Sequence, residues 1–262
     1  MANEKVLSQS FGGIGRLVFN NPDKHNALSL EMWRRAGEIL DEFRADDDIR
    51  VVVLSGAGGK AFVSGADISK FEEERASGAA IREYNEVVGR VSRELHGLPK
   101  PTIAMIQGYC IGGGLALAAC CDLRICAEGS RFGLPAAKLG LGYPFDGLKR
   151  LADTIGLAHT RDICFTARQF DASEAAAMGL VNRVVPAAEL EAVVQDCAET
   201  IAGNAPLTIR AMKCVFGEIA KDPTERDLAA CQSLVDACFS SADYAEGRRA
   251  FVEKRKPVFT GR

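Results

Sequence analysis

Residues 102–126 constrain the fold of this chain more than any other stretch. The apolar run 102–107 lies between prolines and a glycine, which is typical of a buried strand. Three glycines at 112–114 follow, and the pattern predicts an apolar helix over 115–120 and a second apolar strand over 123–126. Glycines at a helix start let unpaired N–H groups approach a ligand, and the helix dipole adds partial positive charge there. This segment is therefore predicted to bind an anionic oxygen.

Residues 51–68 contain a second turn of the same kind. A β-branched strand leads into a glycine-rich loop, and residues 64–67 open another predicted helix. Two backbone N–H groups from separate helix starts that converge on one oxygen form an oxyanion hole. Each segment alone is compatible with an ordinary tight turn between a strand and a helix. The two together, in this order, favour the oxyanion hole.

The remaining pattern predicts mixed α and β structure along the chain. Residues 5–20 alternate as a hairpin with two glycines at its turn, and Ser29 caps a helix that ends near residues 46–48. A polar stretch over 72–79 is expected to be a mobile loop beside the site, and a longer helix follows over 79–97. After about residue 145 nearly everything is predicted to be helical, apart from one short apolar run.

Composition limits the classes of protein to consider. The 262 residues, 47% of them hydrophobic, fit one large domain, or one domain with an appended helical piece. The net charge of −3 does not favour a nucleic-acid partner. Nine scattered cysteines without a CxxC pair, no signal peptide and no apolar run of membrane-spanning length indicate a soluble, cytoplasmic protein with reduced thiols.

Several motifs point to no chemistry of their own. The glycine-rich run 56–60 lacks the spacing and the Ser or Thr of a nucleotide P-loop, and no GxSxG elbow occurs. His25, His96 and His159 are far apart in sequence, so no metal site is expected. His25 lies either beside the path of a bound ligand or in an ordinary loop.

Motifs along essentially the whole chain resemble those of the enoyl-CoA hydratase/isomerase (crotonase) superfamily. They are Asn26-Ala27-Leu28-Ser29, Phe62-Val63-Ser64-Gly65-Ala66-Asp67-Ile68, Gly108 to Gly114 with Cys121-Asp122-Leu123, Phe132-Gly133-Leu134-Pro135, Ala176 to Val185, and Phe251-Val252-Glu253-Lys254-Arg255-Lys256-Pro257. The resemblance implies an α/β fold, a spiral of repeated ββα turns. It places a spiral acyl-CoA-binding core over 1–200 and a C-terminal helical trimerisation region over 201–262. It also implies a homotrimer or a dimer of trimers.

The same resemblance assigns roles to individual residues. It implies that the backbone N–H groups of Ala66 and Gly113 hold the thioester oxygen of an acyl-CoA and stabilise an enolate. No cofactor beyond the coenzyme A part of the substrate, no metal and no membrane is implied. The residues expected to contact coenzyme A are Lys24, Ala27, Ala66, Asp67, Ile68 and Lys254. The alternative for Lys254, weighed equally, is that it only forms part of the solvated end of the last helix.

Two positions depart from the family pattern. Hydratases of this family carry glutamates where this chain has Ala116 and Ala136. A methyl group transfers no proton, so the two-carboxylate activation of water is not expected here. We therefore expect the chain to belong to this family but not to catalyse the hydration reaction.

The loop after Ala136 offers two other catalytic candidates. Tyr143 resembles a tyrosine of methylmalonyl-CoA decarboxylase-like members, although some of these carry a histidine at the position of Ala66. Asp146 is the second candidate. Tyr143 is alternatively a packing residue, and Asp146 alternatively caps a helix that begins near residue 147. The function alternatives are a methylmalonyl-CoA-type decarboxylase and a non-catalytic acyl-CoA-binding or RNA-associated homologue.

Overall fold

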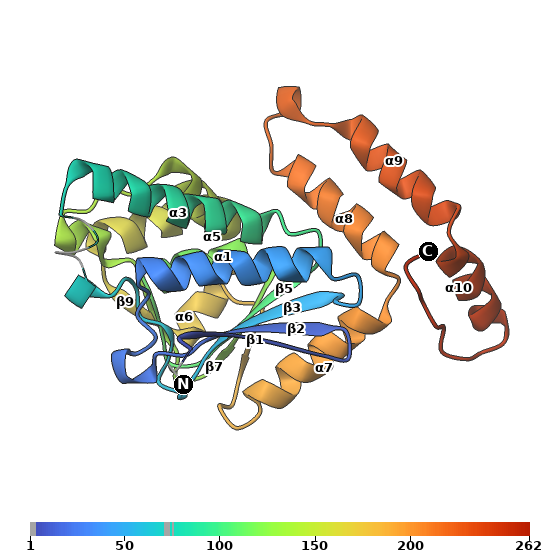
Figure 1. Ribbon diagram of the computed structural model, residues 1–262, viewed down its shortest axis with the longest axis horizontal. Coiled ribbons are helices and arrows are strands. Elements are labelled where there is room, and N and C mark those ends of the chain that lie inside the picture. The colour runs from blue at the N-terminus through green and yellow to red at the C-terminus, as the bar shows by residue number, and fades with distance from the viewer. Residues whose placement is uncertain (1–3, 71–73, 75) are drawn as a thin grey trace.

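A six-stranded sheet forms the centre of the fold (Figure 1). The computed structural model describes residues 4–70, 74 and 76–262. The strand order within this part of the chain is β1-β2-β3-β5-β7-β10; β1 and β2 are antiparallel, and the other neighbours are parallel. The strands are β1 (Val6–Phe11), β2 (Ile14–Phe19), β3 (Val51–Gly56), β5 (Thr102–Ile106), β7 (Leu123–Ala127) and β10 (Arg183–Val185).

The predicted N-terminal hairpin is confirmed. Phe11 pairs with Ile14 across a two-residue turn. Gly12 and Gly13 have φ values of 59° and 82°. A two-residue turn of this kind needs positive φ at both central positions, which glycine adopts at little cost.

A second, smaller sheet is consistent with the spiral of repeated ββα turns that the family resemblance implies, but its individual short strands were not predicted from the residue pattern. In the described residues it has four strands in the order β4-β6-β8-β9, with β9 antiparallel to β8. The strands are β4 (Ala61–Val63), β6 (Tyr109–Ile111), β8 (Arg131–Gly133) and β9 (Gln169–Asp171). The prediction that nearly everything after residue 145 is helical is therefore wrong at β9. Strands of three residues are too short to show the two-residue period that reveals longer ones.

Helices cover both faces of the large sheet, with α1 and α3 on one side and α7 on the other (Figure 1). The helices are α1 (Leu30–Ala45), α3 (Gly78–His96), α4 (Gly113–Cys120), α5 (Phe145–Thr166), α6 (Ala172–Ala177), α7 (Leu190–Gly203), α8 (Pro206–Ile219), α9 (Leu228–Phe239) and α10 (Ala242–Val252). Because both faces are covered, β3 is buried over Val51 to Ser55, and residues 51–54 form a continuous apolar run.

Two predictions about helix starts meet different outcomes. The cap of α1 is confirmed, since the Ser29 hydroxyl accepts a hydrogen bond from Met32 N–H at 3.3 Å. The helix expected after residue 67 begins as a 3-10 turn, Ile68–Lys70. Most of the rest of that prediction, and part of the loop predicted over 72–79, falls on residues 71–73 and 75, which lie outside the described residues.

The C-terminal helices α8, α9 and α10 extend from one end of the molecule (Figure 1). Lys213 of α8 links these helices to residues next to the sheet. Its ammonium group donates to an Asp122 carboxylate oxygen at 2.6 Å and to the Lys100 carbonyl at 2.8 Å. Arg50 adds a second tie by donating to the Phe259 carbonyl at 2.7 Å. None of the helices in the described residues is both long and apolar enough to cross a membrane.

Candidate active site

Three parallel strands of the smaller sheet bring the predicted site together. Strand β4 runs into residues 64–67, β6 runs into α4, and β8 runs into the 3-10 helix Pro135–Leu139. These strands are neighbours and run parallel, so their carboxyl ends meet at one edge of the sheet. The two glycine-rich turns predicted from sequence therefore lie side by side at this edge.

Glycine is required where the two turns touch. A Cβ atom on Gly114 would lie 2.1 Å from the carbonyl oxygen of Val63, so α4 packs directly on the backbone of β4. A Cβ atom on Gly113 would lie 4.0 Å from the Cα of Gly65, which has a φ of 113°. The close approach that the glycine pattern predicts is thus built from backbone against backbone.

The two predicted donor groups are unpaired. Ala66 forms a parallel bridge with Leu28, in which Leu28 N–H donates to Gly65 O and Asp67 N–H donates to Leu28 O, both at 2.8 Å. The N–H of Ala66 itself takes no part in this bridge. Gly113 is the first residue of α4, where helix geometry provides no acceptor. Within the described part of the chain, neither N–H donates a hydrogen bond. Their binding of a thioester oxygen stays a prediction.

The two alanines lie beside these donors. Ala116 follows Gly113 by three residues and so shares its face of α4. Ala136 follows Pro135, whose ring lies 3.9 Å from where a Cβ on Gly112 would stand. Both alanines are partly exposed. The positions from which a carboxylate would reach the site therefore carry methyl groups.

Tyr143 packs its ring against the start of α5. A Cβ on Gly147 would lie 2.7 Å from the ring, so glycine is needed to admit it. Burial, with smaller contributions from Cys120 and Cys164, raises the pKa of Tyr143 well above its usual value. The phenol therefore keeps its proton at neutral pH. No hydrogen bond of its hydroxyl is found among the described residues.

Asp146 does not cap a helix, and that prediction is wrong. Helix α5 begins at Phe145, with Pro144 at the cap position and no side-chain cap. Asp146 is the second helical residue and is exposed. Its negative charge suits the first turn of a helix, where the dipole is positive.

The residues predicted to contact coenzyme A divide into two groups. Lys24 lies beside Asp67 and Ser69, with its Nζ 2.8 Å from an Asp67 carboxylate oxygen and 2.7 Å from the Ser69 hydroxyl. Burial raises the pKa of Asp67, but hydrogen bonds from Lys24 and Ser69 outweigh burial and hold the pKa below its usual value. Ala27 is buried next to this cluster, and Ile68 is exposed.

Lys254 lies far from that cluster within one chain. It follows α10, which Figure 1 places at the opposite end of the molecule from the short helix at residues 68–70. Lys254 is exposed and adopts a positive φ of 52°. The structure of a single chain therefore does not unite the predicted coenzyme A contacts.

Two residues near the site were missed from the sequence. Trp33 belongs to the helix predicted after Ser29 and was given no role of its own, yet its ring lies 3.7 Å from where a Cβ on Gly113 would stand. Glu74 was assigned to a polar loop, yet its carboxylate accepts a hydrogen bond from Leu30 N–H at 2.9 Å, at the start of α1. No local sequence signal distinguishes either residue, because both contacts join segments far apart in the chain.

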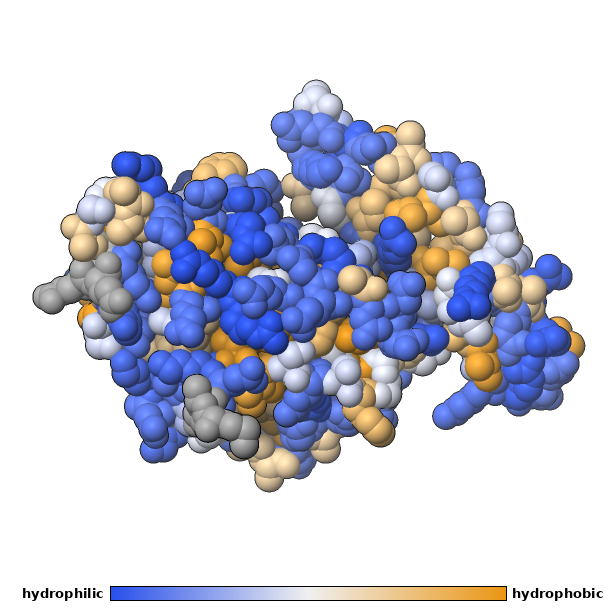
Figure 2. Space-filling model, viewed as in Figure 1, coloured by the Kyte–Doolittle hydropathy of each residue, from blue (hydrophilic) through white to orange (hydrophobic). Residues whose placement is uncertain are grey.

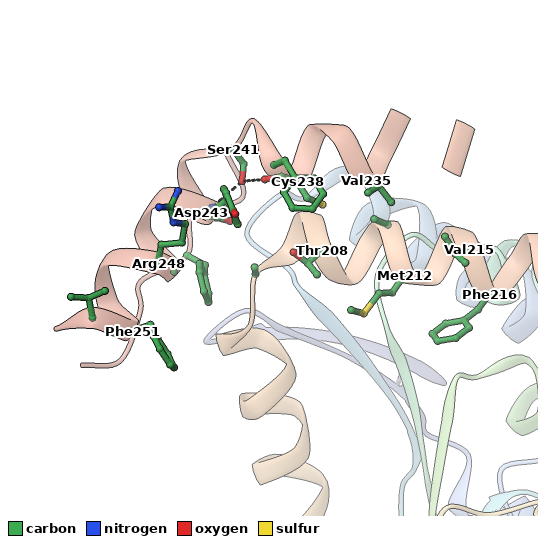
Figure 3. Close-up of a pocket in the computed structure, with 17 residues that line it drawn as sticks. Thr208, Met212, Val215, Phe216, Val235, Cys238, Ser241, Asp243, Arg248 and Phe251 are labelled. Carbon is green, nitrogen blue, oxygen red and sulfur yellow. Dashed lines mark hydrogen bonds between the residues drawn. The ribbon is translucent and has the colours of Figure 1, made fainter. Parts of the chain in front are cut away.

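An apolar cavity of about 830 Å³ lies elsewhere, between α8, α9 and α10 (Figure 3). Met212 and Phe216 project into it from α8, and Phe251 borders it from α10. Apolar side chains gather over the same helices in Figure 2. Phe251 is 86% exposed and Phe216 is 67% exposed. This surface is separate from the edge that carries Ala66 and Gly113.

No cluster of three or more His, Cys, Asp or Glu side chains with metal-binding geometry occurs in residues 4–70, 74 and 76–262. The three histidines are all exposed; His96 ends α3, and His159 lies within α5. His25 packs its ring edge-on against Tyr109, with the ring centres 6.0 Å apart.

Comparison with known proteins gives one consistent family. The model of the enoyl-CoA hydratase/isomerase family matches residues 10–262. A short-chain-enoyl-CoA hydratase of Clostridium acetobutylicum is 33% identical over 98% of this chain and 97% of its own length. A crotonyl-CoA hydratase of Syntrophomonas wolfei is 32% identical over 99% of both chains. The crystal structure of an enoyl-CoA hydratase/carnithine racemase from Magnetospirillum magneticum superposes with a TM-score of 0.93 at 39% identity, covering 100% of this chain and 97% of its own.

Proposed function

The chain belongs to the enoyl-CoA hydratase/isomerase family and has its fold, and we propose that it binds an acyl-CoA thioester and stabilises the enolate of that thioester. The N–H groups of Ala66 and Gly113 hold the thioester oxygen. One observation carries this proposal: two unpaired N–H groups stand on touching turns at the ends of parallel strands.

The energetic contribution of such a pair is large. Removing one oxyanion-hole donor typically costs about 2.7–4 kcal/mol in the reaction barrier. Gly113 adds the positive end of the α4 dipole to its own N–H. The oxygen of a thioester gains negative charge as the enolate forms, so both donors bind the enolate more tightly than the substrate.

The reaction must form an enolate without the usual carboxylates. Ala116 and Ala136 cannot remove a proton from the α-carbon or activate water. Decarboxylation fits this site, because the electrons of the carbon–carbon bond pass to the α-carbon and the thioester oxygen as carbon dioxide leaves. The resulting enolate then takes one proton at the α-carbon. The protonated phenol of Tyr143 supplies this proton or orients the departing carboxylate. Asp146 is the second catalytic candidate in this loop.

The proposal includes the contacts to coenzyme A, which is the only cofactor needed. Lys24, Ala27, Ala66, Asp67 and Ile68 lie in one region, on the spiral core over residues 1–200, and bind it from one side.

Lys254 reaches coenzyme A from a neighbouring subunit of a homotrimer or dimer of trimers. The helices over 201–262 support this assembly, because Phe216, Phe251 and their neighbours form an exposed apolar surface. Light scattering on the purified protein tests it: a monomeric mass at micromolar concentration contradicts the assembly.

A second candidate function is acyl-CoA binding without catalysis. The methyl groups at Ala116 and Ala136 favour it, since they remove the family's acid–base pair. An RNA-associated role has less support, because the net charge is −3.

One experiment separates these functions. The purified protein is incubated with crotonyl-CoA, following loss of enoyl absorbance, and with methylmalonyl-CoA, following product mass. Decarboxylation without hydration is the expected result. Rapid hydration of crotonyl-CoA contradicts the proposed mechanism, because another group then replaces Ala116 and Ala136. Tight coenzyme A binding with neither reaction favours the binding function or another acyl substrate.

A further inference from the structure

Trp33, the chain's single tryptophan, lies beside the proposed oxyanion hole. It belongs to α1 and is 2% exposed. A Cβ on Gly113 would lie 3.7 Å from its Cζ2 atom. In an indole ring, Cζ2 and Nε1 are bonded to the same carbon atom. The edge of the ring that faces Gly113 is therefore the edge that carries the N–H group.

The indole N–H of Trp33 has no hydrogen-bond partner within the described residues. An indole N–H only donates, and a buried one normally finds an acceptor. Leaving such a donor unsatisfied costs about 1–3 kcal/mol, and native proteins contain few of them. Here the donor lies on the ring edge that faces Gly113, beside the predicted ligand site. An acceptor brought by the bound molecule accounts for both its position and its missing partner.

We propose that the indole N–H of Trp33 donates a hydrogen bond to an oxygen on the acyl group of the bound thioester. The inference rests on the proposed function and narrows its substrate class to acyl-CoA thioesters with a carboxylate or hydroxyl close to the thioester carbonyl. A carboxylate fits better, because a hydrogen bond to a charged acceptor is the stronger one. The methyl groups of Ala116 and Ala136 also leave that carboxylate without a like charge at either position. Trp33 is thus a specificity-determining residue.

Binding of matched analogues tests this role. In the amide analogues of methylmalonyl-CoA and isobutyryl-CoA, nitrogen replaces the thioester sulfur, so the acyl group does not react. The two differ only in a carboxylate against a methyl group. We expect the wild type to bind the methylmalonyl analogue at least about 10-fold more tightly. Trp33→Phe keeps an aromatic ring but lacks the donor, and it should lose this preference while its affinity for the isobutyryl analogue changes by less than about threefold.

The 3-hydroxybutyryl and butyryl analogues form a second matched pair. If the wild type prefers the 3-hydroxybutyryl analogue to the butyryl analogue, if Trp33→Phe loses that preference, and if only this pair behaves so, the acceptor is a hydroxyl rather than a carboxylate. An equal preference in wild type and Trp33→Phe for both pairs overturns the proposal.

The wild-type protein supplies a measurement that needs no variant. With one tryptophan, the ¹⁵N-labelled protein gives one indole N–H resonance. The proton chemical shift of this resonance should move downfield when the methylmalonyl analogue binds and should not do so when the isobutyryl analogue binds. Binding of both analogues with the same small shift overturns the role of Trp33 and leaves the proposed function standing. Failure of every analogue to bind overturns the proposed function itself.

Discussion

Replacing Gly113 by proline removes one proposed oxyanion donor and puts the ring carbon Cδ in the place of its hydrogen. Gly113 is the first residue of α4, where proline is favoured and the N–H makes no helical hydrogen bond. Its φ is not positive, and a Cβ there would meet Trp33 at 3.7 Å, an ordinary contact. We therefore expect the free energy of unfolding to change by less than about 1 kcal/mol. The rate should fall at least about 10²–10³-fold, the effect of losing one donor, because the Cδ atom also takes space beside the thioester oxygen.

Gly113→Ala is the matched control, because it adds the same Cβ and keeps the N–H. Its rate should stay within a few-fold of wild type. A second assay needs no knowledge of the natural substrate. Bound 4-dimethylaminocinnamoyl-CoA absorbs at longer wavelength when its thioester carbonyl accepts hydrogen bonds. This red shift should persist in Gly113→Ala and shrink in Gly113→Pro.

Two results would refute this reasoning. Full activity and an undiminished red shift in Gly113→Pro would mean that this N–H does not bind the thioester oxygen. Equal losses in the proline and alanine variants would assign the effect to packing against Trp33 rather than to the donor.

Three further substitutions test the surroundings of the site. Gly114→Ala should lower the free energy of unfolding by at least about 1–3 kcal/mol and abolish activity, because its Cβ would stand 2.1 Å from the carbonyl oxygen of Val63. Thermal unfolding measures the loss of stability, and turnover measures the loss of activity. Arg124→Met should cost about 3 kcal/mol in urea unfolding, because Arg124 is 7% exposed and its guanidinium pairs with buried backbone carbonyls. Asp67→Asn should cost about 1 kcal/mol at neutral pH, where Asp67 pairs with Lys24. Because the folded pKa of Asp67 is lowered, the wild type should hold this advantage above pH of about 4 and lose it as the pH falls through the folded pKa; unfolding at a series of pH values checks the sign.

The parts of the fold that local chemistry determines were predictable. Paired glycines fix the hairpin turn, Ser29 fixes the start of α1, and an apolar run followed by glycines fixes β5 and α4. The strands of the smaller sheet were not predictable from the residue pattern, because strands such as β8 and β9 have three residues each and are defined by their partners. Yet this sheet aligns the ends of its strands at the candidate site. The resemblance therefore implied the fold correctly, while the residue pattern alone did not reveal the short strands that align the candidate site.

The candidate site shows the same division. Glycine patterns marked the two turns, and the resemblance to the family singled out Ala66 and Gly113 within them as the proposed donors. Trp33 was not singled out, since its importance lies in a contact between α1 and α4 and in an acceptor that the described residues lack. A buried tryptophan on an apolar helix face is common, and only the structure shows that the N–H of Trp33 has no partner among the described residues.

These donors favour one kind of chemistry over another. Ala66, Gly113 and Trp33 offer N–H groups, and Tyr143 offers a protonated hydroxyl, so each of them can donate and none can accept a proton at neutral pH. The nearby carboxylate of Glu74 already accepts a hydrogen bond from the start of α1. Apart from Asp146, the second catalytic candidate, the proposed site residues therefore fit a substrate that forms its enolate by releasing a group that leaves its bonding electrons behind. Carbon dioxide is such a group, and the carboxylate that would release it is also the acceptor that we propose for the indole N–H of Trp33. The proposed chemistry and the proposed specificity of Trp33 therefore require the same feature of the substrate.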